Sequence, residues 1–458
     1  MLRVVEAFSG IGSQAKALKK LGIEFKVVNT VEWDIAACYA YDLIHNGEQD
    51  LTKYLNIPKD ELLRILTKYS LSTDGKTPVN MRFLKTWPED SLRKVLCAIN
   101  RTRNLGSITD VTYDMLPKKI DLLTYSFPCQ DLSICGSWHG NMSGIDRTAN
   151  NRSGMLWEVE RILKEMHDAK RKLPKFLLME NVSNILSKTH LGNFKEWQDF
   201  LEELGYVNKV YTLNAANFGS PQKRVRTYML SVFCPDERRK KVVQNYFEKN
   251  DLEKQEPMKR RDIKTCFRTD YSIKQYKTEA DISNMNDTPS RRKIFEDNEI
   301  VFDGIKFVTD SVNTLTTKQD RNPTSGLIVY PEHAPGKSIY RNFTPRECFL
   351  LMGFDEQDYE SVAANNIFIR KDKLLYSRER FEKLAGNSIV VDVLVAIFAQ
   401  VDQLNTMLWN GAYIPRNGEK RKYKKHKQSL HKTVPEIIFT DTEKGMNKGS
   451  DNFAKQVK

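Results

Sequence analysis

The chain has 458 residues, 40% of them hydrophobic and 10% aromatic, and a formal net charge of +13 at pH 7. This length can bury a large core divided over two or three domains, and the apolar content argues against a disordered chain. No apolar run approaches the roughly 20 residues that a membrane span needs, and seven scattered cysteines without a CxxC pair argue against a disulfide framework or a structural zinc site, so we expect a cytoplasmic protein.

The first third of the chain alternates short apolar runs with helical patterns. Residues 3–8 predict a strand, residues 9–13 a glycine-rich turn, and residues 14–21 a helix that ends at Gly22. Later apolar runs predict further strands at residues 25–31, 120–126, 176–180 and 227–233. Strands that alternate with helices indicate an α/β fold with a doubly wound, mostly parallel sheet, whose ligands bind at the carboxyl ends of the strands.

Two stretches interrupt this pattern. Residues 46–105 are polar and rich in Lys and Arg, which indicates a helical insertion. Residues 235–340 contain charge runs and few long apolar runs, which indicates a second, smaller domain inserted before the last part of the first. We therefore expect a catalytic domain over residues 1–234, the smaller domain over 235–340, a return segment over 341–402 that completes the catalytic domain, and a basic tail over 403–458.

The tail holds much of the net charge. Residues 416–432 carry eight Lys and Arg against one acid, Glu419. Such a segment is more often a solvated surface than a specific reader of nucleic acid. The charge makes a polyanionic partner plausible and indicates nothing more specific.

The first strand and turn have the features of a nucleoside pocket. Phe8, Gly10 and Gly12 stand where the strand passes into the helix, and glycine there lets the backbone turn tightly and approach a ligand. Glu32 ends the second strand, where a carboxylate can accept both hydroxyls of a ribose, and Trp33 beside it offers a flat face to an adenine. The third glycine of the dinucleotide fingerprint is missing, so the pattern favours S-adenosylmethionine. An ordinary strand–helix turn with a surface Glu is the alternative from these residues alone.

Three further strand ends carry reactive side chains. Cys129 and Glu180 each follow or end a buried strand, and Gln222, Arg224 and Arg226 open another with a spacing that predicts one shared face. Taken singly, a cysteine is most often an inert core residue, and an acid at a strand end is as often an ion-pair partner or a helix cap.

Together these residue types meet the demands of methylation at carbon 5 of cytosine. C5 is a poor nucleophile until a thiolate adds to C6, and Cys129 can supply that thiolate. A carboxyl group at N3, from Glu180, stabilises the adduct, and a guanidinium on O2, from Arg226, orients the ring. The activated C5 then takes the methyl group, and loss of its proton expels the thiolate.

Seven motifs occur in the order found in a known family. They span residues 4–401 and read FSGIG, EWD, SFPCQDLS, MENV, QKRVR, FTPRECFLLMGF and GNS. This ordered set resembles the cytosine-C5 DNA methyltransferases. The resemblance implies a Rossmann-like methyltransferase domain with a smaller target-recognition domain, S-adenosylmethionine as methyl donor with S-adenosylhomocysteine as product, and no metal. It also implies that a cytosine is flipped out of double-stranded DNA at a short recognition sequence.

The resemblance carries over to single residues. Cys129 is similar to the family's nucleophile, Glu180 to the acid that contacts N3 and N4, and Arg226 to the arginine that reaches O2. Asn181 matches the residue that braces the catalytic loop, and Gln222 belongs to the same catalytic motif as Arg226. The cofactor pocket is expected to include Phe8, Gly10, Gly12, Glu32, Trp33, Ser107, Ile108, Pro128 and Asn387. DNA contacts are expected from Arg224, which matches a phosphate-contacting arginine, and from Gln130, Thr314 and Thr316.

The chain departs from the family pattern in three places. Ser107 stands where the family commonly has an Asp that binds the adenine amino group, and Asp110 is a weaker substitute. The insertion at residues 46–105 is longer than in compact members, and the basic tail is extra.

These features favour a bacterial or phage modification enzyme that acts as a monomer in the cytoplasm near the nucleoid, with a cognate restriction endonuclease as a separate chain where one exists. The first alternative is the same chemistry on tRNA, which the length of the 235–340 segment disfavours. A non-catalytic DNA-binding regulator is disfavoured by the complete set of catalytic residue types. A repressor with a helix-turn-helix in the tail is disfavoured because residues 416–432 lack an apolar core.

Overall fold

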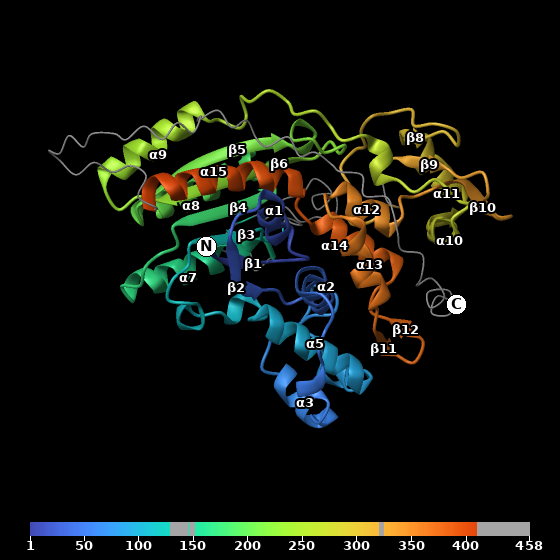
Figure 1. Cartoon of the computed structure of the whole chain (residues 1–458), viewed down its shortest axis with the longest axis horizontal. Helices are drawn as coiled ribbons and strands as arrows, with labels where there is room; N and C mark the ends of the chain where they lie inside the picture. Colours follow the sequence, from blue (N-terminus) through green and yellow to red (C-terminus); the bar gives the residue numbers. More distant parts are fainter. Residues whose placement is uncertain (129–144, 146–151, 320–324, 410–458) are drawn as a thin grey trace. The chain divides into compact units, whose positions relative to one another are not determined.

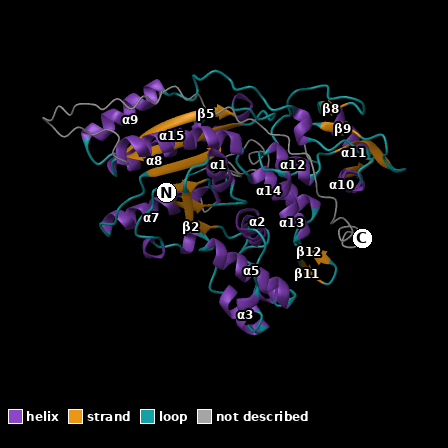
Figure 2. Ribbon diagram, viewed as in Figure 1, coloured by secondary structure: helices purple, strands orange, loops and turns teal. Residues whose placement is uncertain are grey.

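The main sheet of the protein has six strands. The structure, a computed structural model, describes residues 1–128, 145, 152–319 and 325–409. The strands are Leu2–Ala7 (β1), Phe25–Val31 (β2), Leu122–Tyr125 (β3), Phe176–Val182 (β4), Tyr206–Asn214 (β5) and Val225–Phe233 (β6). They lie in the order β2-β1-β3-β4-β6-β5, with β1 to β4 parallel and β6 antiparallel to both β4 and β5 (Figures 1 and 2). The predicted α/β fold with a mostly parallel sheet is confirmed.

Helices cover this sheet along both faces. Their bounds are Ser13–Leu21 (α1), Ile35–Asn46 (α2), Leu156–Asp168 (α7), Leu191–Glu203 (α8), Glu237–Lys249 (α9), Arg378–Asn387 (α14) and Val391–Trp409 (α15). On one face, Leu163 of α7 and Trp197 of α8 join Met179 of β4 in one buried apolar cluster. α15 runs beside β5 (Figure 1), and the Tyr211 hydroxyl donates a hydrogen bond of 2.9 Å to Gln400. Alternation along the strands sends successive side chains to these two layers.

The polar stretch at residues 46–105 contains three α-helices. They are Lys59–Leu66 (α3), Met81–Leu84 (α4) and Glu89–Thr102 (α5). α5 begins after Pro88 with Glu89 and Asp90 in its first turn, where acids interact favourably with the helix dipole, and it ends at Arg103 in the left-handed conformation. Its buried residues recur at helical spacing and include Leu92, Val95, Leu96 and Ile99.

The smaller sheet lies within residues 235–341. Its strands are Asn284–Asn286 (β7), Ile300–Phe302 (β8), Leu327–Val329 (β9) and Lys337–Arg341 (β10), in the order β7-β10-β9-β8. Further elements are Lys274–Ser283 (α10), Pro289–Glu296 (α11), Pro345–Leu351 (α12), Glu356–Ala364 (α13), Phe368–Arg370 (β11) and Lys373–Leu374 (β12). Two buried ion pairs, Arg341 with Glu347 and Arg346 with Glu279, join these elements to the return segment. The described residues up to Leu404 form one compact unit. The predicted domain limits stay a prediction.

One helical stretch among the described residues, Arg378–Trp409, is long and apolar enough to cross a membrane by length and composition, and 78% of its most apolar window is buried inside the protein. The expectation that no apolar run approaches this length is therefore wrong. A helix that packs against neighbours on all sides is apolar all round, and such a core helix passes the same test.

The glycine turn after β1 is shaped by two left-handed backbone positions. Gly10 has φ +54° and open space where a Cβ would stand. Gly12 has φ +82°, and a Cβ there would lie 2.2 Å from Nε2 of His45 and 2.6 Å from the ring of Tyr41. His45 is partly buried against the turn, with Nε2 3.0 Å from the carbonyl of Ile11. Only glycine fits at Gly12 for both reasons.

This difference gives a matched pair of substitutions. We expect Gly10→Ala to lower the free energy of unfolding by about 1 kcal/mol, the cost of a left-handed alanine. Gly12→Ala adds the steric conflict with His45 and Tyr41 and should cost about 3 kcal/mol. Urea unfolding of both variants without ligand measures the two values, and equal losses would show that the turn tolerates a side chain at either position.

Candidate active site

The strand ends that carry the predicted site residues meet at one edge of the main sheet. Ala7 pairs with Tyr125, and Tyr125 pairs with Met179, so β1, β3 and β4 end side by side. β6 runs the opposite way, so its first residues reach the same edge, where Arg226 pairs with Val182. Because adjacent strands lie about 4.8 Å apart, the ends of β1 and β4 are about 10 Å apart.

Glu32 is tied to the glycine turn through its carboxylate. Oε2 accepts a hydrogen bond of 2.9 Å from the Gly10 N–H, and Oε1 accepts one of 2.8 Å from the Asp34 N–H. Burial, aided by the charge of Asp34, raises the pKa of Glu32 to about 7, while these hydrogen bonds and Lys383 oppose the rise. The carboxylate is thus held next to the glycine turn, and with a pKa of about 7 it changes its protonation state near neutral pH.

Trp33 follows Glu32 in sequence, Phe8 follows β1, and both side chains are partly exposed. Phe8 has a positive φ of 55°, unusual for a residue with a side chain, and its N–H donates to the Val31 carbonyl. The two aromatic residues and Glu32 therefore stand at neighbouring strand ends. These are the groups that a nucleoside needs: flat faces and an acceptor for hydroxyls.

The remaining predicted cofactor residues come from three other segments. Ser107 caps the short turn Ile108–Asp110 and bonds the Thr109 hydroxyl at 2.8 Å, and Ile108 is buried. Pro128 follows β3, and Asn387 is the exposed last residue of α14.

Asn104 is a site residue that the motif analysis does not include. Its buried amide contacts the backbone of both Glu32 and Gly106. The only sequence signal is a polar residue two positions before Gly106, which patterns alone do not distinguish from a surface residue.

Glu180 and Arg226 form an ion pair at the catalytic edge. The distance from Arg226 Nε to Glu180 Oε1 is 3.5 Å, and both side chains are largely buried. Burial raises the pKa of Glu180, and the charges of Arg226 and Arg224 oppose that rise. A buried carboxyl with a raised pKa can stay protonated and donate a hydrogen bond at neutral pH.

Asn181 connects this pair to the segment after β3. Its Nδ2 donates a hydrogen bond of 3.1 Å to the carbonyl of Phe127, and both residues are buried. Cys129 and Gln130, which follow this segment, lie outside the described residues. The five described cysteines are all buried: Cys38, Cys97, Cys234, Cys266 and Cys348. Burial raises the pKa of each thiol, to about 12 for Cys38 and Cys234, so these side chains are poor nucleophiles.

Gln222 and Arg224 contact a different part of the chain from Arg226. β6 begins at Val225, so strand alternation does not extend back to them. The Arg224 guanidinium is buried and donates to the carbonyls of Leu315, Gly386 and Ser388 at 2.8 to 3.1 Å. The predicted shared face for the three side chains is therefore wrong.

The Gln222 amide is likewise enclosed. Its oxygen accepts from the Leu315 N–H at 2.9 Å, and its nitrogen donates to the Leu351 carbonyl at 3.3 Å. Thr314 and Thr316, on either side of Leu315, are partly exposed, and the Thr314 hydroxyl donates to the Lys223 carbonyl.

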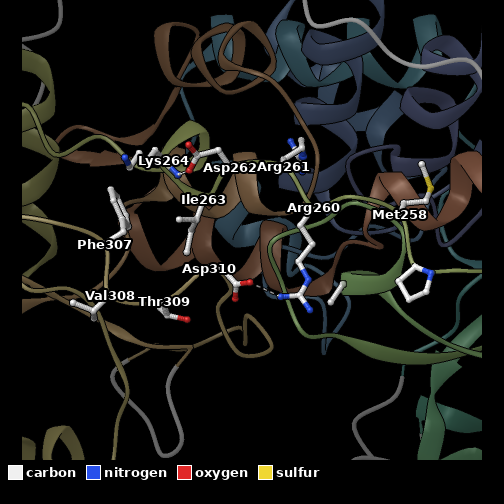
Figure 3. A pocket seen from close by; sticks show the side chains of 12 residues that line it. Met258, Arg260, Arg261, Asp262, Ile263, Lys264, Phe307, Val308, Thr309 and Asp310 are labelled. Carbon is white, nitrogen blue, oxygen red and sulfur yellow. Dashed lines mark hydrogen bonds and ion pairs between the residues drawn. The ribbon is translucent and has the colours of Figure 1, made fainter.

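A cavity of about 710 Å³ lies apart from these residues, between the segments 257–264 and 307–310 (Figure 3). Arg260 pairs with Asp310 across it at 3.0 Å, and none of the predicted catalytic or cofactor residues lines it. In the described part of the chain, no group of three or more His, Cys, Asp or Glu is placed to hold a metal ion.

Comparison with known proteins places these features in context. The sequence profile of the family described as C-5 cytosine-specific DNA methylase matches residues 75–403. The chain is 34% identical over 409 residues to the orphan methyltransferase M.SssI of Spiroplasma monobiae, covering 87% of this chain and 97% of the relative. It is 31% identical over 402 residues to the type II methyltransferase M2.ScrFI of Lactococcus lactis subsp. cremoris, covering 88% and 99%.

A solved structure supports the fold. The S. pombe Dnmt2 methyltransferase superposes with a TM-score of 0.54 at 18% identity, covering 88% of this chain and all of that one. At this identity the likeness shows the shared fold alone.

The raised pKa of Glu32 predicts pH-dependent nucleoside binding. Ribose hydroxyls donate to the ionised carboxylate, so affinity for S-adenosylhomocysteine should fall as the pH drops below about 7, approaching tenfold per unit. Calorimetric titration between pH 5.5 and 8.5 measures this profile. Glu32→Gln should bind more weakly at pH 8 and lose the pH dependence; an unchanged profile in this variant would assign the titration to another group.

Proposed function

Because the chain belongs to the C-5 cytosine-specific DNA methylase family and is a DNA (cytosine-5) methyltransferase that uses S-adenosylmethionine, we propose that Cys129, Glu180 and Arg226 perform the reaction on a cytosine flipped out of the duplex. The observation that carries this proposal is the edge of the main sheet. There, Glu180 and Arg226 are paired, and Asn181 links them to the segment that leads into Cys129.

S-adenosylmethionine is assigned to the surroundings of Glu32. Gly10 leaves open space before α1, the carboxylate of Glu32 accepts from its N–H, and Phe8 and Trp33 are partly exposed. When bound, the cofactor supplies an electrophilic methyl group on its sulfonium. We assign the ribose to Glu32 and the adenine to the region of Trp33, Ser107 and Ile108.

The chain's own residues activate the base. The thiolate of Cys129 adds to C6 of cytosine, and electron density moves toward C5 and N3. Burial favours the protonated form of the Glu180 carboxyl, which hydrogen-bonds to N3 as negative charge develops there, and Arg226 donates to O2. C5 would take the methyl group as the bond between that methyl and the cofactor's sulfur breaks. The C5 proton would then leave to a base, and the electron pair it leaves behind would break the C6–sulfur bond and expel the Cys129 thiolate from 5-methylcytosine.

DNA is the substrate, and we propose that residues 235–340 read a short recognition sequence, with Thr314, Thr316 and Gln130 near the DNA. The phosphate contact expected of Arg224 stays a prediction, because its guanidinium would have to leave three carbonyls to reach a phosphate. We further propose a monomeric cytoplasmic enzyme, metal-free, that releases S-adenosylhomocysteine and protects DNA from a separate restriction endonuclease.

The reaction and its target can be tested together. Labelled S-adenosylmethionine and unmethylated genomic DNA should give methyl incorporation, and bisulfite sequencing should find protected cytosines within one short recurring sequence. The same assay with tRNA is the counter-test. Exclusive labelling of tRNA would overturn the DNA assignment.

Cys129→Gly tests the nucleophile. The variant should bind DNA and S-adenosylhomocysteine as the wild type does, yet transfer no methyl group, because no thiolate is left to add to C6. Cys234→Ala is the matched control, since its buried thiol has a pKa of about 12 and it should keep full activity. Substantial turnover by Cys129→Gly would remove this residue from the reaction.

A further inference from the structure

The insertion at residues 46–105 reaches into the neighbourhood of the cofactor pocket. Ser72, fully buried, pairs with the chain beside Glu32: its N–H donates to the Trp33 carbonyl at 2.7 Å, and its carbonyl accepts from the Ile35 N–H at 2.9 Å. The insertion therefore supplies a hydrogen-bonded backbone neighbour to the residues that follow β2.

The same turn of the insertion also contacts Gly106. A Cβ at Gly106 would lie 3.4 Å from the Ser70 carbonyl oxygen and 3.5 Å from the Tyr69 Cβ, and its φ of +79° favours glycine. The segment from Tyr69 to Ser72 thus lies against both the backbone beside Glu32, at Trp33, and the turn before Ser107, at Gly106.

Asn104, at the end of the insertion, joins these two sides directly. Its Oδ1 accepts from the Glu32 N–H at 2.9 Å and from the Gly106 N–H at 3.2 Å, and its Nδ2 donates to the Glu32 carbonyl at 2.7 Å. The side chain is 2% exposed. An amide is suited to this position because it offers an acceptor and a donor to the N–H and C=O of one residue, Glu32, and a second acceptor lone pair to the N–H of Gly106.

Because of Ser107, the position that Asn104 gives to Gly106 relative to Glu32 matters more. Its hydroxyl caps the turn that follows and is bonded to Thr109, so it is already engaged within the chain. Recognition of an adenine at this turn then depends on where the backbone of Gly106 and Ser107 stands relative to Glu32.

We propose that Asn104 is a positioning residue which, supported by the Tyr69–Ser72 turn, sets the separation between the ribose-binding carboxylate and the adenine-binding turn. The insertion is thereby part of the cofactor pocket. The inference rests on the proposed function for the identity of the nucleoside, and on the contacts above for the placement.

The test compares Asn104→Ala with Asn100→Ala, an exposed asparagine of the same insertion that bonds the Tyr54 hydroxyl. Asn104→Ala should weaken S-adenosylhomocysteine binding about tenfold or more, because two backbone groups of Glu32 lose their partner. The KM for S-adenosylmethionine should rise equally, with kcat at saturation and DNA affinity unchanged. Asn100→Ala should leave all four values as in the wild type.

The preference of the protein for one nucleoside base over another distinguishes a positioning role of Asn104 from a general contribution to stability. The wild type should prefer S-adenosylhomocysteine to S-inosylhomocysteine, and Asn104→Ala should reduce that preference. A loss of affinity that is equal for both ligands, with kcat and DNA affinity falling in parallel, would overturn the proposal. So would unchanged affinity.

Asn104→Asp covers the case in which the alanine variant does not fold. It keeps the acceptor to Glu32 and Gly106 but adds a negative charge next to Glu32, whose carboxyl already interacts with Asp34 and Lys383, so the midpoint of the pH profile for S-adenosylhomocysteine binding should move upward. An unmoved midpoint would contradict the placement. Because these are binding measurements, a wild type that binds the ligand but methylates no cytosine would reject the proposed function and leave this inference standing.

Discussion

The antiparallel pairing of β6 with β4 is the constraint on which the site depends. In an all-parallel sheet the start of β6 would lie at the opposite edge from the end of β4. Here the reversed direction places Arg226 opposite Val182, within 3.5 Å of the Glu180 carboxylate. Because β1, β3 and β4 run in parallel, the glycine turn and the segment leading to Cys129 end at that same edge. One change of strand direction thus brings the Glu180–Arg226 pair to the same edge of the sheet as the glycine turn.

Burial then determines the chemistry at this edge. Removing a carboxyl group from water disfavours its charged form, which raises the pKa of both Glu32 and Glu180. The consequences differ because the partners differ. Glu32 accepts two backbone N–H groups and stays an acceptor near neutral pH, whereas Glu180 is paired with the Arg226 guanidinium at 3.5 Å.

Buried hydrogen bonds connect Arg224 to the segments around Leu315 and Gly386. Arg224 binds the carbonyl of Leu315 and those of Gly386 and Ser388, which come from two segments distant in sequence from Arg224. Gly386 also packs so closely on the backbone of Thr316 that a Cβ would lie 2.7 Å from its carbonyl carbon. Buried charges of this kind contribute less to stability than to a single arrangement, because a mispaired guanidinium would be left without acceptors.

The sequence by itself determined the strands, the glycine turn, the family and the order of the reactive residues, because these follow from local apolar patterns and from motif spacing. It also led to two errors. Alternation was extended back from β6 to Gln222 and Arg224, because local pattern does not show where a strand begins. The apolar content of Arg378–Trp409 was underestimated, although the sequence itself contains it. Only the tertiary structure decided that Asn181 reaches Phe127, that Asn104 joins Glu32 to Gly106, and that the insertion lies against both. Each of these contacts joins residues distant in sequence through a single side chain or a short turn, and no periodicity records such a contact.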